Sequence, residues 1–220
     1  MRVSLSLMII ALLALGGMSA GPAAAQEEGW ISLFNGETLS GWKANENEQT
    51  WSVQDNMIVC DGPRSHLFYQ GPVQNHDFEN FELKLEVFLR PGANSGVYFH
   101  TEYQDSGWPA KGFEVQLNNT MEGEPRKTGG LYAVEDVTGE SPAPDNEWFT
   151  MHIIVDGNDI TVKVNGETTT EFTVTEDYQP PEGSSGRVLD SGTFALQGHD
   201  PESKAYFTNI RVKRLPEETN

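Results

Sequence analysis

Three side chains suited to proton transfer lie in short segments of the chain. His100 ends the segment 96–100, Glu114 lies within 113–117, and His199 follows another apolar segment. Imidazole titrates near neutral pH, and the surroundings of a carboxylate can tune it to act as a general acid or base. We therefore predict His100, Glu114 and His199 as catalytic residues, with His100 as the base. For His199 a metal-ligand role and an ordinary surface position remain open.

Residue alternation gathers further polar side chains beside two of these candidates. In a strand, successive side chains point to opposite faces. With the apolar residues of 96–100 on one side, Tyr98 and His100 project from the other, and Glu114 shares a face with Gln116. This predicts a polar and aromatic platform suited to a sugar. The alternative is a solvated outer face of a sheet.

Aromatic and amide side chains complete the predicted binding surface. Aromatic rings cover the apolar C–H surface of pyranose rings, which favours Trp108 in a loop and Tyr132 after two glycines. Core packing is the alternative for both rings. The predicted substrate-binding residues are Asn94, Tyr98, Trp108, Gln116, Tyr132 and Gln197. The tryptophans predicted to lie in the core are Trp42, Trp51 and Trp148.

Short strands must position these side chains. Period-two alternation predicts strands at 81–87, 96–100, 113–117, 151–155, 160–164, 193–197 and 205–212. The turn residues at 156–159 predict an antiparallel hairpin. No segment shows a sustained helical period, and many glycines and prolines separate the strands. We therefore predict an all-β fold, a two-sheet antiparallel jelly-roll sandwich.

Four long intervals between these strands are expected to wall the site: 101–111, 118–128, 134–146 and 178–190. One of them contains Asp136, Glu140 and Asp145, whose composition suggests calcium. A divalent metal such as calcium is thus a candidate cofactor. No motif assigns its ligands.

The N-terminus and the charge bear on location and partners. Arg2, the apolar run 5–15 and the alanines at 23–25 predict a signal peptide over 1–25, a single domain over 26–220, and export to the periplasm or medium. The competing reading, a membrane anchor, is disfavoured because the apolar run is too short to span a bilayer. A formal charge of −19 disfavours nucleic acid as a partner. Cys60 is the only cysteine, so the chain has no internal disulfide.

Several motifs in order resemble one family. They are Leu33-Phe34-Asn35-Gly36, Leu39-Ser40-Gly41-Trp42, Trp51-Ser52-Val53, Asn94-Ser95-Gly96-Val97-Tyr98-Phe99, Gly112-Phe113-Glu114-Val115-Gln116-Leu117, Gly130-Leu131-Tyr132, Val164-Asn165-Gly166, Leu196-Gln197-Gly198-His199 and Phe207-Thr208-Asn209-Ile210-Arg211. Together they resemble the 3-keto-disaccharide hydrolase domain family from about Trp30 to Leu215. The resemblance implies a concanavalin A-like jelly roll whose partner is a carbohydrate. At His100 the chain departs from many members, which carry arginine there.

The resemblance also implies a reaction, the cleavage of glycosides oxidised at C3. The ketone acidifies the hydrogen on C2, and the resulting enolate expels the substituent on C1, either as a lyase or with net hydrolysis. Such a site needs a base near C2, a positive or hydrogen-bonding group at the C3 oxygen, and an acid for the leaving oxygen. The alternative functions are a non-catalytic carbohydrate-binding jelly-roll module and a structural or partner-binding jelly roll.

Overall fold

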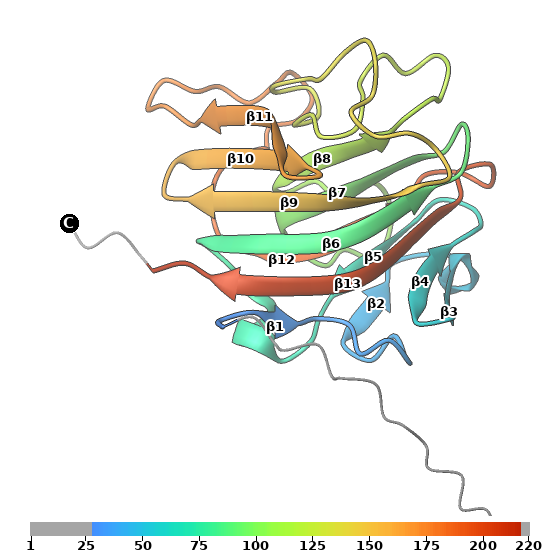
Figure 1. The fold of residues 1–220 in the computed structure, drawn as a ribbon. Coiled ribbons are helices and arrows are strands. Elements are labelled where there is room, and N and C mark those ends of the chain that lie inside the picture. The colour runs from blue at the N-terminus through green and yellow to red at the C-terminus, as the bar shows by residue number, and fades with distance from the viewer. Residues whose placement is uncertain (1–27, 217–220) are drawn as a thin grey trace, which may run out of the picture.

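The computed structural model describes residues 28–216 as two antiparallel β-sheets packed face to face (Figure 1). This confirms the predicted all-β, two-sheet jelly-roll class. The predicted signal peptide lies outside the described residues. Between residues 28 and 216, no helix is long and apolar enough to cross a bilayer.

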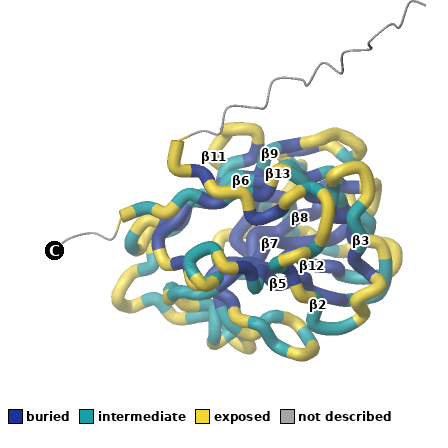
Figure 2. Tube along the Cα trace, turned by 90° about the horizontal axis from the view of Figure 1, so that it is seen from below, coloured by how far each residue is buried: buried dark blue, intermediate teal, exposed yellow. Residues whose placement is uncertain are grey.

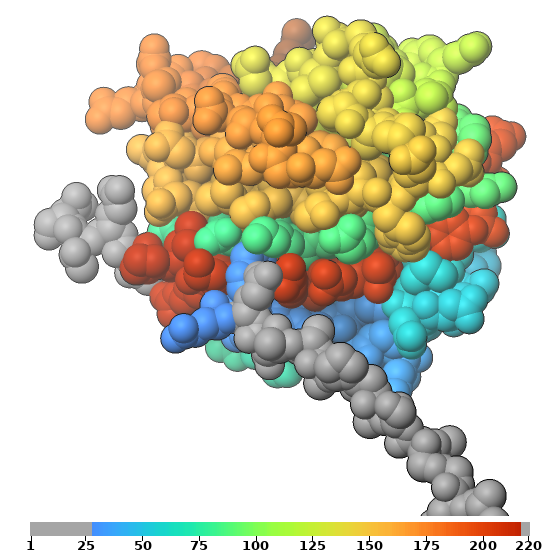
Figure 3. Space-filling view, viewed as in Figure 1, coloured from blue at the N-terminus to red at the C-terminus, as the bar shows by residue number. Residues whose placement is uncertain are grey.

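The larger sheet has the strand order β11-β10-β9-β6-β13-β4-β3, with β1 paired to β13. Its strands are β1 (Ile31–Ser32), β3 (Trp51–Gln54), β4 (Met57–Cys60), β6 (Phe81–Leu89), β9 (Trp148–Asp156), β10 (Asp159–Val164), β11 (Glu167–Thr173) and β13 (Ala205–Arg214). Along β6 buried apolar residues alternate strictly with half-buried ones. The sheet therefore has one face in the core and one toward solvent, where Figure 3 shows bands from the yellow of β9 through the green of β6 to the red of β13.

The smaller sheet carries the residues of interest. Its order is β2-β5-β12-β7-β8, with β2 (Trp42–Ala44), β5 (Ser65–Tyr69), β7 (Asn94–Thr101), β8 (Phe113–Asn118) and β12 (Thr193–Gly198). Two short 3₁₀ turns, η1 (Glu48–Thr50) and η2 (Val73–His76), lie between strands. Every residue of β7, β8 and β12 is buried. Loops must therefore cover the face of this sheet that points away from the larger one.

The core lies between the sheets and is rich in aromatic rings. Phe78 stacks on Phe194 with ring centroids 4.5 Å apart, and Phe99 stacks on Phe113 at 5.5 Å. Truncating such a phenylalanine to alanine typically costs about 3–5 kcal/mol of stability. Cys60 lies in the same core as a free thiol, and burial raises its pKa to about 12. Figure 2 shows the buried strands enclosed by exposed loops.

All seven predicted strands are present, and the 156–159 turn joins β9 to β10 as the predicted antiparallel hairpin. Strands β1 to β5 and β11 were not predicted because they are very short, almost wholly apolar or almost wholly polar, and so lack clear alternation. The prediction for Trp148 is wrong. Trp148 is the first residue of β9, in the larger sheet, and its side chain is 44% exposed.

Candidate functional site

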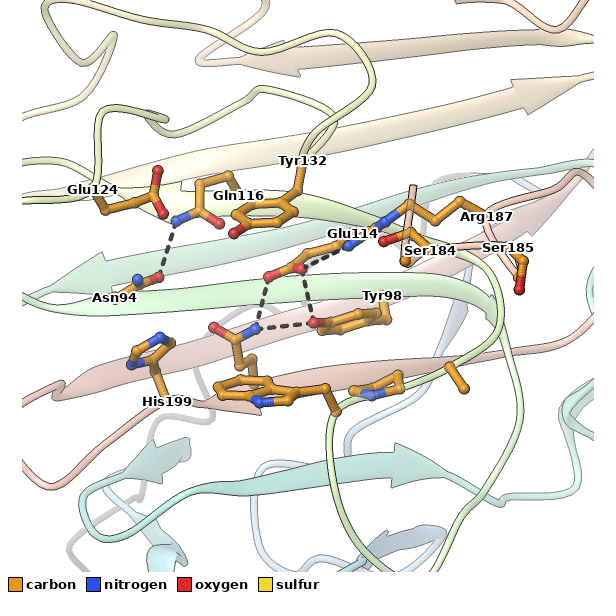
Figure 4. A pocket seen from close by; sticks show the side chains of 16 residues that line it. Asn94, Tyr98, Glu114, Gln116, Glu124, Tyr132, Ser184, Ser185, Arg187 and His199 are labelled. Atoms are coloured by element: carbon orange, nitrogen blue, oxygen red, sulfur yellow. Dashed lines mark hydrogen bonds and ion pairs between the residues drawn. The ribbon is translucent and has the colours of Figure 1, made fainter. Parts of the chain in front are cut away.

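A pocket of about 450 Å³ opens on the outer face of the smaller sheet (Figure 4). Side chains of β7, β8 and β12 form its floor, and loops on either side form its walls. Its lining residues are Asn94, Tyr98, Trp108, Pro109, Ala110, Glu114, Gln116, Glu124, Tyr132, Gly183, Ser184, Ser185, Gly186, Arg187, Gln197 and His199.

Strand alternation explains why these floor residues share one face. Tyr98 pairs with Glu114 across β7 and β8, so their side chains project on the same side. The intervening residues Val97 and Val115 join the core on the other side. The predicted platform is therefore present, but loops cover it.

Glu114 is the centre of a buried hydrogen-bond network. Tyr98 donates its hydroxyl to Oε2 at 2.8 Å, and Gln197 donates Nε2 to Oε1 at 2.7 Å. Burial raises the pKa of Glu114, although the hydrogen bonds from Tyr98 and Gln197 and the charge of Arg187 oppose the shift. This carboxyl group therefore holds a proton more readily than an exposed glutamic acid does, which is a property of a general acid.

Gly96 makes room for this carboxylate. A Cβ at position 96 would lie only 2.6 Å from Oε1 of Glu114. Any larger residue would push the Glu114 side chain out of its network. The glycine in β7 therefore allows the close approach of a neighbouring side chain.

Arg187 supplies the positive charge of the pocket. Its Nη2 lies 3.5 Å from Oε2 of Glu114, and its guanidinium lies 5.3 Å from the ring centre of Tyr132. Nε and Nη1 are buried and have no hydrogen-bond partner among the described residues. These two donors are available for an oxygen atom of a ligand that carries negative charge.

The loop that carries Arg187 is fastened to the β7–β8 connection. The Gly112 amide donates to the Gly186 carbonyl at 2.8 Å, and a Cβ at Gly186 would meet the Ala110 carbonyl oxygen at 2.0 Å. Lys111 and Asp190 add an ion pair at 2.9 Å. The backbone of the loop therefore packs so closely that only glycine fits at position 186.

His199 and Asp200 form a second polar group at the end of β12. His199 donates Nδ1–H to Oδ2 of Asp200 at 2.6 Å. Burial acts to raise the pKa of Asp200, but the hydrogen bonds from His199, Glu202 and Ser203 outweigh it, and the pKa is lowered. An ionised Asp200 thus orients the imidazole and leaves Nε2 as the nitrogen that can exchange a proton.

Amide and aromatic groups line the remaining walls. Gln116 donates to Oδ1 of Asn94 at 2.9 Å. The ring of Tyr132 is in contact with Arg126, whose guanidinium lies 4.6 Å from the ring centre. Trp108 is 43% exposed, and its ring lies 5.2 Å from that of His199. Amides and exposed aromatic rings are the groups that suit a hydroxylated, ring-shaped ligand.

His100 is the predicted site residue that does not line the pocket. Its φ of +53° and a register shift between β7 and β12 interrupt alternation at this point. The ring turns toward Phe81 and Phe99, at 5.7 and 5.3 Å. The prediction that His100 shares a face with Glu114 is therefore wrong.

The actual contacts of His100 are structural. Nε2–H donates to the Glu79 carbonyl at 2.9 Å, and Nδ1 accepts from the Asp190 amide at 3.4 Å. Burial lowers the pKa of His100 to about 4, so the ring is neutral at pH 7. His100 thus ties the chain before β12 to the chain before β6.

The remaining predicted residues, Asn94, Tyr98, Trp108, Glu114, Gln116, Tyr132, Gln197 and His199, all line the pocket. Arg187 was missed. It lies in the long interval 178–190, which was expected to wall the site, but no motif marks the one arginine that reaches Glu114. Glu124 was missed for the same reason.

The suggested calcium ligands do not converge. Within residues 28–216 no group of three or more His, Cys, Asp or Glu side chains is placed to hold a metal ion. Asp136 binds Arg126 at 3.0 Å, whereas Asp145 accepts a hydrogen bond from Thr120. A divalent ion stays a prediction, to be checked by measuring metal content and activity before and after dialysis against a chelator.

The two-sheet antiparallel sandwich is a lectin-like fold, and its pocket combines polar side chains with the exposed ring of Trp108. The chain belongs to the 3-keto-alpha-glucoside-1,2-lyase-like domain family, whose model matches residues 29–213. It is 22% identical over 231 residues to a 3-keto-disaccharide hydrolase of Bacteroides thetaiotaomicron, covering 86% of this chain and 79% of the relative.

Solved structures agree with this placement. A candidate glycosyl hydrolase from Parabacteroides distasonis superposes with a TM-score of 0.73 at 25% identity, over 86% of this chain and 95% of that one. The carbohydrate-binding module CBM66 from Bacillus subtilis superposes with a TM-score of 0.55 at 11% identity, over 79% and 95%. The second likeness shows the fold alone.

Proposed function

We propose that this protein cleaves 3-keto-glycosides by abstracting the proton on C2. The observation that carries the proposal is one pocket that holds an oriented imidazole, a buried arginine with unused donors and a buried carboxyl group with a raised pKa. These are the base, the oxyanion-stabilising group and the acid that an elimination through an enolate needs. The family and the Bacteroides relative support the substrate class.

Each residue has one role in this mechanism. His199 takes the C2 proton on Nε2, and Asp200 stabilises the imidazolium that forms. The electrons of the C2–H bond move into an enolate, whose oxygen at C3 is stabilised by Arg187. When the enolate re-forms the ketone, the C1–O bond breaks with formation of a C1–C2 double bond. Protonated Glu114 delivers its proton to the leaving oxygen.

Net hydrolysis needs one further step. Water adds to the product of elimination, with its hydroxyl on C1 and its proton on Glu114, while the imidazolium of His199 returns a proton to C2. Both residues regain their initial protonation states, and the products are a 3-keto-sugar and the free alcohol. A lyase would release the unsaturated sugar before this step.

The test compares matched substrates. The purified protein is incubated with 4-nitrophenyl 3-keto-glucoside and with the same glucoside unoxidised, and nitrophenol release is followed. We expect turnover of the first substrate alone, because only the ketone acidifies C2. His199→Ala should lower kcat by about 10²–10⁴-fold, as loss of a general base does. Equal cleavage of both substrates contradicts the mechanism.

A non-catalytic carbohydrate-binding module is the second candidate. The observation that favours it is the exposed ring of Trp108 at the mouth of the pocket, since a stacking ring serves binding without chemistry. Such a module would bind the sugar and release no alcohol. It would also keep its affinity in His199→Ala.

We further propose that the protein is exported through the N-terminal segment 1–25. Expression in a bacterial host followed by cell fractionation and N-terminal sequencing tests this. We expect the mature chain to begin after Ala25 in the periplasmic or extracellular fraction. A cytoplasmic chain that retains Arg2 contradicts export.

A further inference from the structure

His66 lies next to the pocket without a role in the proposed reaction. It pairs with Gln197 between β5 and β12, and cross-strand partners project to the same face with Cβ atoms about 5 Å apart. The neighbouring residue Leu67 joins the core on the opposite face. The imidazole therefore extends the row formed by Gln197, Tyr98 and Glu114.

The hydrogen-bonding capacity of this imidazole is unused. His66 is fully buried, and neither Nδ1 nor Nε2 has a hydrogen-bond partner among residues 28–216. Oε1 of its strand partner Gln197 is also buried without a partner there, while Nε2 of the same amide is engaged by Glu114. Buried polar groups nearly always have partners, so two neighbouring exceptions need an explanation.

The rings around His66 explain its burial but give it no hydrogen bond. Tyr98 and Trp108 contact it edge to face, with centroids 5.5 and 5.3 Å away, and Phe68 lies at 6.4 Å. Burial, together with the nearby charge of Arg64, lowers the pKa of His66 to about 3. The ring is therefore neutral, with one nitrogen as donor and the other as acceptor.

We propose that His66 and Gln197 form a subsite for one sugar hydroxyl, covered here by the indole of Trp108. A hydroxyl group both donates and accepts, so it can accept from the imidazole N–H and donate to Oε1 of Gln197. This inference rests on the proposed carbohydrate substrate and adds a residue that selects among sugars.

Access to this subsite requires Trp108 to move. The backbone at Trp108 is held, because its carbonyl accepts from Gln104 at 2.8 Å and the carbonyl of Gly107 accepts from Asn45 at 3.2 Å. The indole is 43% exposed. The movement is thus a rotation of the indole about its own side-chain bonds, while the loop stays in place.

A cycle of ligand and protein changes tests the subsite. Calorimetry measures the affinity of 3-keto-glucose and of its 2-, 4- and 6-deoxy analogues for the wild type, His66→Phe and His66→Gln. We expect one deoxy analogue to bind the wild type about tenfold more weakly than the parent sugar, the effect of one hydrogen bond. His66→Phe should weaken the parent by a similar factor and remove that difference, and His66→Gln should restore part of it.

A second measurement uses the wild type alone and so does not depend on the folding of a variant. The imidazole ¹⁵N resonances of His66 should shift on saturation with 3-keto-glucose, whereas those of His152, on the larger sheet, should not. Equal affinity ratios in wild type and His66→Phe, unshifted His66 resonances, or no binding of the sugar overturns the subsite.

The outcome is separable from that of the proposed reaction. If the loss of affinity for a deoxy analogue depends on His66 but a 3-keto-glucoside is not cleaved, the reaction is rejected and the subsite is kept. If the 3-keto-glucoside is cleaved but that loss of affinity does not depend on His66, the subsite is rejected and the reaction is kept.

Discussion

The two sheets share the same alternating pattern of apolar and polar residues but treat their polar faces differently. On the larger sheet the polar face is open: Glu82 and Glu86 of β6 are half-buried and bind neighbours such as His152 and Thr150 at the surface. On the smaller sheet the polar face is covered, and Glu114 and Gln116 are buried. Loops far apart in the sequence provide this cover.

The difference between the two sheets indicates which of them carries the functional site. A buried polar group costs free energy unless it is hydrogen-bonded, and a buried charge costs more. On the covered face of the smaller sheet, Gln197 and His66 keep unused hydrogen-bonding capacity, as does Arg187 of the loop that covers it. Unused capacity at the floor of a pocket indicates a ligand-binding face.

Removing equivalent carboxylates from the two sheets should give the largest contrast. Glu114→Gln removes the proposed acid and should lower kcat/KM on a 3-keto-glucoside by about 10²–10⁴-fold. Glu86→Gln, on the open face of β6, should change it by less than about twofold. Steady-state kinetics measure both. Comparable losses in the two variants would show that the carboxylate of the pocket has no special role.

The histidines of the two sheets should differ in their effect on stability at low pH. Burial lowers the pKa of His66 to about 3 and that of His100 to about 4, so between these values and about 6.5 the unfolded chain binds more protons than the folded one. Stability should therefore fall as the pH drops from about 6.5 to 4, by about 3 kcal/mol for His100 alone.

Urea unfolding at pH 4.5 and 7 checks this pH dependence. His66→Phe and His100→Phe should each reduce the difference in unfolding free energy between the two pH values. His152→Gln, on the larger sheet, is the comparison: burial also lowers the pKa of this half-buried histidine, but Glu82 opposes the shift, so we expect this variant to have the smallest effect. If only His152→Gln reduces the difference in unfolding free energy between the two pH values, the pH dependence arises on the open face of the larger sheet instead.

A methyl group added at Gly96 tests whether activity depends on the position of the Glu114 carboxylate in the smaller sheet. Gly96→Ala places a methyl group against Glu114 and should cost about 1–3 kcal/mol in stability. Displacement of the carboxylate should also lower kcat by up to about 10²-fold. The control is Gly92→Ala, where φ is +74° and nothing crowds the position. It should lose about 1–2 kcal/mol and keep full activity.

The smallest expected effect separates two equally exposed tryptophans. Trp108, at the pocket, is 43% exposed, and Trp148, on the larger sheet, is 44% exposed. With the indole stacking on the sugar after it rotates off His66, Trp108→Ala should weaken binding of 3-keto-glucose by about 2–12-fold, the usual range for an aromatic contact. Trp148→Ala should leave binding unchanged. Calorimetric titration distinguishes them, and equal effects would contradict a stacking role for Trp108.

The sequence by itself determined the class of fold and most of the pocket floor. Period-two alternation depends only on local backbone geometry, so it placed Tyr98, Glu114 and Gln116 correctly on one face. The same rule failed at His100, where a positive φ and a bulge reverse the direction of one side chain. No residue type around position 100 predicts that bulge.

Only the tertiary structure decided which polar face is covered and which residues cover it. Arg187 and Trp108 reach the floor from loops whose course depends on contacts with distant segments, such as the bond between the Gly112 amide and the Gly186 carbonyl. Alternation assigns a face but cannot say whether solvent or another part of the chain lies against it. The buried histidine at position 66 became visible for the same reason, because burial is a property of packed neighbours and not of local sequence.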